Sequence, residues 1–252
     1  MRASQTLAEP GISAWGWMIA ILRLCFMLAL LVVCVPLHYL WRLLRLGRFW
    51  PRVFLSGIGL TAGLEITIHG KARPGTLLLS NHVSWLDIPA LAQGAGSAFV
   101  AHDGLAAIKP LKWLCDMNET VFVARHRRAT VAEQAEQIRE AIDNGGTLTL
   151  FPEGTTSDGT GMLPFKSALL SAVMPLPEGV TVQPVLLAYE DVPEMAWVGE
   201  EPGMDNFFRI IARLRPLRLA IHFLEPLHGA ELADRKAMSA AAEARLRNAM
   251  TL

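Results

Sequence analysis

Short apolar runs, separated by helical patterns and polar loops, constrain the fold of this chain more than any other feature of its sequence. The runs lie at residues 64–70, 75–80, 97–101, 120–124, 147–151, 180–189 and 217–224. Continuous apolar runs of this length are typical of buried strands, and their alternation with helices is typical of an α/β sheet. We therefore predict a single α/β domain with a mixed, largely parallel sheet flanked by helices.

The clearest helical pattern covers residues 129–146, where apolar side chains recur every three or four positions until Gly145 ends the pattern. Its apolar positions are Val131, Ala135, Ile138 and Ile142. A second, Ala-rich amphipathic pattern covers residues 232–250. Because no repeat or linker divides the rest, we separate only a helical membrane-anchor segment, residues 1–58, from a main domain, residues 59–252.

The membrane-anchor segment is strongly apolar between residues 17 and 41, where Arg23 and one histidine are the polar interruptions. Its uninterrupted core, residues 24–37, is shorter than the roughly 20 residues that a straight span needs. Arg23 can place its guanidinium at one interface, so a span and a segment that only dips into the bilayer both remain open. A secretory signal is not favoured, because bulky residues follow the apolar core.

Arginines alternate with aromatic and apolar residues in the segment that follows, residues 41–52. The arginines are Arg42, Arg45, Arg48 and Arg52. This spacing predicts an interfacial helix on anionic lipid, and the alternative is the basic, solvated face of a core helix. By the positive-inside rule, the rest of the chain faces the cytoplasm, which predicts a location at the cytoplasmic (inner) membrane.

The overall charge and the cysteines exclude several classes of protein. The formal net charge is zero, so nucleic acid is not expected as a partner. Cys25, Cys34 and Cys115 form no C-x-x-C motif, which indicates neither a disulfide framework nor a zinc site.

Polar residues follow three of the predicted strands, in the segments "SNHVSWLD" (80–87), "ARHRR" (124–128) and "PEGTTSDG" (152–159). Ligands of open α/β sheets bind at the carboxyl ends of the strands, so these loops predict a binding site. The loop at 152–159 also fits a solvated strand-to-helix connection, and its residues alone favour that interpretation.

His82 and Asp87 are the candidate catalytic pair. Ser84 can cap a helix beginning at Trp85, with Asp87 as its third residue, and this capping box is compatible with a carboxylate that also orients the imidazole. A histidine and an acid without an evident nucleophile point to general-base activation of a substrate hydroxyl. Ser84 lacks the G-x-S-x-G context of a nucleophile. A metal site is not indicated either, because no second histidine lies nearby at ligand spacing.

"NHVSWLD" resembles the N-H-x-x-x-x-D block of the glycerolipid (1-acylglycerol-3-phosphate) O-acyltransferase family, and "FPEGTTS" resembles its F-P-E-G-T block. "VFVAR", ending at Arg125, "LPFKSALL", around Lys166, and "VTVQPVLLAY", with Pro184, are similar to further family segments, so the resemblance covers about residues 65–190. It implies that residues 59–252 form an acyltransferase domain. It also implies transfer of a fatty acyl group from acyl-CoA or acyl carrier protein to 1-acyl-sn-glycerol-3-phosphate, giving phosphatidic acid.

The resemblance also implies residue roles. His82 would be the general base and Asp87 its partner, with no covalent acyl-enzyme, metal or cofactor. Glu153, Gly154, Thr155 and Thr156 would position the acceptor. Arg125 would bind anionic groups, with Lys166 as a further cation. The expected partners are membrane lipids, the lysolipid acceptor and the acyl-CoA or carrier-protein donor.

The chain departs from the family pattern at two positions. Phosphatidate-forming members usually carry arginine where this chain has Thr156, and commonly lysine where it has His102. Both missing cations favour a phosphate, so acylation of a lyso-ornithine lipid is the alternative prediction. A non-catalytic lipid-binding homologue and a thioester hydrolase are two further alternatives.

Overall fold

The computed structural model describes residues 11–123, 136, 138, 140–142, 146–199 and 201–251. All seven predicted strands are present: β1 (Leu64–His69), β2 (Thr76–Ser80), β3 (Ala98–His102), β4 (Val121–Val123), β5 (Thr147–Leu150), β6 (Thr181–Tyr189) and β7 (Leu217–Phe223). They form one sheet in the order β1-β7-β6-β2-β5-β3-β4. The predicted α/β fold is therefore confirmed.

Neighbouring strands run parallel throughout this sheet except at β6 and β7, which pair antiparallel. The strands β6, β2, β5, β3 and β4 consequently end at the same edge of the sheet. Within this group, β2 lies between β6 and β5. The polar loops that follow β2 and β5 therefore lie side by side, as the site prediction requires.

The helices are α1 (Ala14–Leu43), α2 (Phe49–Ala62), α3 (Asp87–Ala95), α4 (Lys109–Met117), α6 (Val192–Met195), α7 (Gly203–Ile211) and α8 (Arg235–Met250), with 3-10 turns η1 (Asp103–Ala107), η3 (Leu169–Val173) and η4 (Gly229–Leu232). The predicted helix at 129–146 lies largely outside the described residues. Within it, Ile138 and Ile142 are helical and buried. The predicted C-terminal helix is α8, whose first backbone N–H groups are capped by Asp234.

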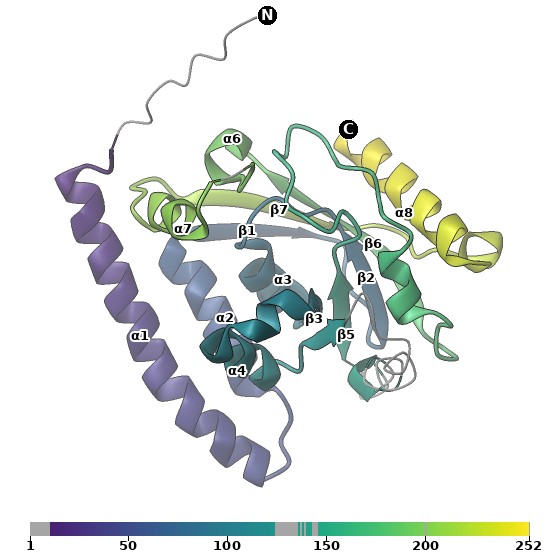
Figure 1. The fold of residues 1–252 in the computed structure, drawn as a ribbon, viewed down its shortest axis with the longest axis horizontal. Helices are drawn as coiled ribbons and strands as arrows, with labels where there is room; N and C mark the ends of the chain where they lie inside the picture. The colour runs from purple at the N-terminus through teal and green to yellow at the C-terminus, as the bar shows by residue number, and fades with distance from the viewer. Residues whose placement is uncertain are drawn as a thin grey trace, which may run out of the picture.

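Side chains from alternate positions of the central strands fill two separate cores, one on each face of the sheet. In β2, Leu78 belongs to the core beneath α2, α3 and α7, whereas Leu77 and Leu79 belong to the core beneath α8. Figure 1 shows α8 on one side of the sheet and α1, α2 and α3 on the other. Burial on both faces explains why the central strands read as continuous apolar runs.

The helix α1 docks on the domain through a narrow stripe and exposes the rest of its apolar surface (Figure 1). The stripe consists of Gly16, Ala20, Met27, Cys34 and His38. α1 is long and apolar enough to cross a membrane, with a mean hydropathy of 2.8 over its most apolar stretch. Gly57 of α2 permits the close approach of α1, because a Cβ there would lie 2.7 Å from the side chain of Leu30.

The guanidinium of Arg23, for which the sequence predicted a position at a membrane interface, contacts the main domain. It donates hydrogen bonds to the carbonyl oxygens of Ile211 and Arg213, at 3.1 and 2.9 Å. These carbonyls lie at the end of α7, where a helix leaves its last carbonyls without backbone partners. Arg23 therefore fastens α1 to the main domain.

The prediction of one interfacial helix at residues 41–52 is wrong. α1 ends at Leu43 and α2 begins at Phe49, because Arg45 and Gly47 both adopt left-handed backbone conformations. Arg48 is not available to lipid, since it pairs with Glu119 at 2.9 Å and is 11% exposed. The predicted domain boundary at residue 58 falls inside α2.

Candidate active site

His82 and Asp87 meet at the carboxyl end of β2. Nδ1 of His82 lies 2.7 Å from Oδ2 of Asp87, whose side chain is fully buried, whereas the His82 side chain is 21% exposed. This contact fixes the orientation of the ring and directs its remaining nitrogen, Nε2, to other partners. Among the described residues, none makes a hydrogen bond to Nε2, so this nitrogen is available to a substrate.

Asp87 also orders the turn that carries His82. Its Oδ2 accepts hydrogen bonds from the backbone N–H groups of Val83 and Ser84, at 2.7 and 3.0 Å. The predicted helix beginning at Trp85 starts instead at Asp87, after a turn over residues 84–87. Asp87 therefore caps the turn through the Ser84 N–H and also orients the imidazole, because the same buried oxygen accepts both hydrogen bonds.

The other oxygen of Asp87 is held by Tyr189, at the end of β6. The phenolic hydroxyl donates to Oδ1 at 2.6 Å, and both side chains are buried. Burial, together with the charge of Asp87 and this hydrogen bond, raises the pKa of Tyr189 well above its ordinary value. Tyr189 thus remains a hydrogen-bond donor, and the Asp87 carboxylate is fixed from two sides.

The loop after β5 holds the backbone of His82. Oε1 of Glu153 accepts from the His82 N–H at 2.9 Å, and the N–H of Ser157 donates to the His82 carbonyl at 2.7 Å. Oε2 of Glu153 accepts from the N–H of Leu163 at 3.0 Å. Burial raises the pKa of Glu153 above its ordinary value of 4.5, although the two backbone hydrogen bonds oppose this shift.

This geometry differs from the predicted role of Glu153 in positioning the acceptor. The side chain is fully buried, and each of its oxygens already accepts a backbone hydrogen bond. Glu153 therefore lies beneath the catalytic turn and contacts its backbone. A carboxylate in a Gly- and Thr-rich loop usually lies in solvent, so this burial could not be predicted from local patterns.

The His82 imidazole stacks on Phe151, with ring centroids 4.1 Å apart and an interplanar angle of 19°. Beside it lies a cavity of about 340 Å³. The described residues that line this cavity are His82, Thr155, Thr156, Trp197, Gly199 and Glu201. An imidazole fixed by Asp87 and Phe151 at the wall of an open cavity can accept a proton from a bound hydroxyl.

The other predicted site residues surround the loop after β5. Gly154 has a φ of +70°, and a Cβ there would lie 3.3 Å from Nζ of Lys166, so the exposed lysine lies next to this glycine. The hydroxyl of Thr156 donates to the carbonyl of Trp197. Arg125 and the side chain of His102 lie outside the described residues.

Sequence reasoning missed three residues that shape the site. The side-chain amide oxygen of Asn81 accepts from the Leu187 N–H at 2.8 Å and its nitrogen donates to the Leu187 carbonyl at 3.0 Å, which joins the catalytic turn to β6. Tyr189 supports Asp87, and the N–H of Trp197 donates to the Val83 carbonyl at 3.0 Å. A tyrosine that ends a buried strand needs a hydrogen-bond partner, and this signal could have identified Tyr189.

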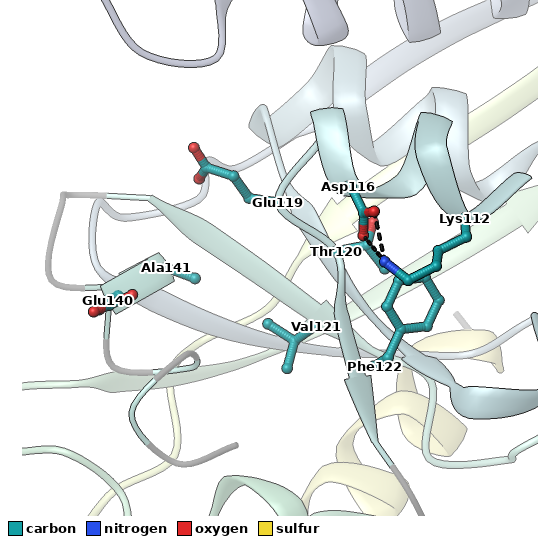
Figure 2. Close-up of a pocket in the computed structure, with 8 residues that line it drawn as sticks. All are labelled: Lys112, Asp116, Glu119, Thr120, Val121, Phe122, Glu140 and Ala141. Atoms are coloured by element: carbon teal, nitrogen blue, oxygen red, sulfur yellow. Dashed lines mark hydrogen bonds and ion pairs between the residues drawn. The ribbon is translucent and has the colours of Figure 1, made fainter. Parts of the chain in front are cut away.

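A second cavity, of about 500 Å³, opens between α4 and β4 and shares no described residue with the first (Figure 2). On its wall, Nζ of Lys112 binds both oxygens of Asp116, at 2.8 and 2.6 Å. No histidine, serine or cysteine is among its described lining residues. Within the described residues, no group of three or more histidines, cysteines or acids could hold a metal ion.

Comparisons with known proteins indicate the family of the chain. The family model described as Acyltransferase matches residues 65–188. The chain is 33% identical to the lyso-ornithine lipid O-acyltransferase of Brucella abortus, over 88% of this chain and 90% of that protein. It is 31% identical to the 1-acyl-sn-glycerol-3-phosphate acyltransferase of Neisseria gonorrhoeae, over 74% and 75% of the two chains.

Among solved structures, the fold is similar to that of the 1-acyl-sn-glycerophosphate acyltransferase PlsC of Thermotoga maritima. The TM-score is 0.65 at 20% identity, covering 93% of this chain and 95% of that one. The relatives and the apolar helix α1 together indicate an enzyme associated with a membrane. The chain belongs to the acyltransferase family, and it is a lysophospholipid-type acyltransferase.

Proposed function

We propose that the protein transfers a fatty acyl group from a thioester, acyl-CoA or acyl carrier protein, to the free hydroxyl of a lyso-ornithine lipid. Nε2 of His82 removes the proton of that hydroxyl, and the oxygen attacks the thioester carbonyl. The new ester C–O bond forms as the C–S bond breaks, and the imidazolium returns its proton to the leaving thiolate. Asp87 stabilises the imidazolium throughout, and no acyl-enzyme forms.

The negative oxygen that develops on the thioester carbonyl needs a hydrogen-bond donor that is not already engaged. The backbone N–H groups of Val83 and Ser84 donate to Asp87, and that of His82 donates to Glu153. In the described part of the chain, no hydrogen bond engages the backbone N–H of Thr155, which lines the cavity. We assign the oxyanion contact to this N–H group.

The residues that line the cavity beside His82 favour the lyso-ornithine lipid as the acceptor. Of the described residues that line it, none is a lysine or an arginine, and one is the carboxylate Glu201. Partial burial raises the pKa of Glu201, but hydrogen bonds from Arg209 and Asn206 outweigh this and lower the pKa below its ordinary value. Glu201 pairs with Arg209 through both of its oxygens, each at 3.0 Å, so the described lining offers no unpaired cation to a phosphate, and this favours an acceptor without one. The relative from Brucella abortus supports the same acceptor.

Acylation of 1-acyl-sn-glycerol-3-phosphate, giving phosphatidic acid, is the second candidate. The ammonium of Lys166 lies next to Gly154 of the catalytic loop, where it could neutralise a phosphate. The relative from Neisseria gonorrhoeae carries this activity in its name.

The domain would work from the cytoplasmic face of the inner membrane. Arg42 and Arg45 are exposed at the end of α1, where basic residues set orientation by the positive-inside rule. The exposed apolar surface of α1 would lie in the bilayer, so the cavity would meet its lipid substrate at the interface.

A competition assay tests the acceptor. Purified, detergent-solubilised protein receives a labelled acyl donor and equal amounts of lyso-ornithine lipid and lysophosphatidate. We expect the larger kcat/KM for the aminolipid. Faster turnover of lysophosphatidate would establish the second candidate, and release of free fatty acid without either product would identify a thioester hydrolase instead.

A further inference from the structure

Four aromatic rings form a continuous row between the apolar helix α1 and the catalytic turn. Trp17 of α1 contacts Phe208 of α7, with ring centroids 5.4 Å apart. Phe208 contacts Phe207 at 5.6 Å, and Phe207 contacts Trp85 at 5.3 Å. Trp85 belongs to the turn that carries His82. The row thus links the membrane helix to the catalytic histidine's own loop.

The short helix α7 makes this row possible. Consecutive helical residues point about 100° apart, so Phe207 and Phe208 reach different neighbours, Trp85 on one side and Trp17 on the other. The N-terminal residue of α7, Gly203, lies against Trp197 of the cavity, where a Cβ would meet the indole at 3.0 Å. α7 therefore connects the cavity beside His82 with α1, as its place beside α1 in Figure 1 illustrates.

Three rings of the row pack against the core, and the fourth ring is exposed on α1. Trp85, Phe207 and Phe208 are half-buried and pack against the core that contains Ile210. Trp17 is 43% exposed and adjoins the exposed apolar residues of α1. A strip of apolar side chains that a core keeps in place loses little conformational freedom when an apolar ligand binds along it.

We propose that this row, Trp17, Phe208, Phe207 and Trp85, binds the acyl chain of the lysolipid acceptor. The site rests on the function proposed above, because its occupant is the acceptor of that reaction. The row is continuous with the apolar surface of α1, and it ends at the turn where the acceptor hydroxyl must meet Nε2 of His82. An acyl chain lying on it leads the headgroup from the bilayer to the cavity.

Chain-length dependence distinguishes this role from a structural one. Each buried methylene is worth roughly fourfold in binding, so loss of a ring from the row should weaken long-chain acceptors far more than short-chain ones. A substitution that only disturbs folding would lower turnover of every acceptor by the same factor.

The experiment compares Phe207→Ala and Phe208→Ala with the parent protein, using lysolipids with hexanoyl and palmitoyl chains and one fixed acyl donor. We expect KM for the palmitoyl acceptor to rise about tenfold, with a much smaller rise for the hexanoyl acceptor. Phe54→Ala, at a half-buried position of α2 outside the row, is the matched control and should not change the ratio.

Trp17→Ala provides the independent variant, because Trp17 is 43% exposed and is not part of the buried core. It should reproduce the selective loss of the long-chain acceptor. Equal losses for both acceptor chain lengths would overturn the site. If the parent protein acylates neither lysolipid, the proposed function fails. If the parent acylates both and the variants leave the ratio of the two KM values unchanged, only the acyl-chain site fails.

Discussion

The hydroxyl of Tyr189 donates a 2.6 Å hydrogen bond to Oδ1 of Asp87, although the two residues lie 102 positions apart in the sequence. Asp87 is therefore oriented from β6 as well as from its own turn. Since His82 depends on Asp87 for its orientation, the strand β6 takes part in positioning the general base.

The variant Tyr189→Phe removes this hydrogen bond while keeping the ring. We expect kcat to fall about tenfold with little change in KM, because hydrogen bonds to charged groups contribute about 1.5–3 kcal/mol. Steady-state kinetics with the lysolipid acceptor measures the effect. An unchanged kcat, or an increase in KM alone, would mean that Tyr189 does not act through Asp87.

The variant Asp87→Asn separates the charge of the carboxylate from its geometry. An asparagine oxygen can accept from His82 and the two backbone N–H groups, and its amide can donate to the Tyr189 oxygen, so the turn should fold. The neutral side chain cannot stabilise the imidazolium, and we expect kcat to fall about 10³-fold or more. Thermal unfolding should show a melting temperature close to that of the parent; near-normal turnover would contradict the assigned role.

The variant Glu153→Gln tests the buried carboxylate beneath His82. Burial raises the pKa of Glu153 in the folded protein above 4.5, so the folded state binds the proton more tightly than the unfolded state. The stability of the parent relative to this variant should therefore fall as pH rises from about 4.5 through the raised pKa, since glutamine does not titrate.

Unfolding of both proteins by denaturant, followed between acidic and neutral pH, measures this difference. A relative stability that increases with pH over the same window would show that the folded-state pKa is lowered instead.

The variant Thr156→Arg tests the acceptor preference. It restores a cation beside the cavity, and charge-assisted hydrogen bonds should raise turnover of lysophosphatidate relative to lyso-ornithine lipid about tenfold. Thr156→Gln is the control, because it also loses the hydroxyl that donates to Trp197 but adds no charge. If both variants change the ratio equally, position 156 does not recognise the headgroup by charge.

The strands could be predicted from the sequence because their residues are buried on both faces of the sheet. Leu77, Leu78 and Leu79 of β2 are all fully buried, which produces an unbroken apolar run with no helical period. His82 and Asp87 were found because one local turn brings them together.

The contacts that cross the sheet could not be predicted in this way. Tyr189 reaches Asp87 only because β6 pairs with β2 in parallel, and this register is not visible in local patterns. The break between α1 and α2 was missed because helical spacing continues through residues 41–52, although Arg45 and Gly47 reverse the backbone there. Glu153 was predicted to position the acceptor, and its burial could not be predicted because its loop is rich in polar residues.

The measurement that tests the central claim most directly compares His82→Ala with the parent protein for transfer of a labelled acyl group to a lysolipid. If Nε2 of His82 is the general base, the variant should lose about 10³-fold or more of kcat while it still binds acceptor and donor with unchanged affinity. Turnover within about tenfold of the parent would show that another group activates the hydroxyl, and the role assigned to His82 would be wrong.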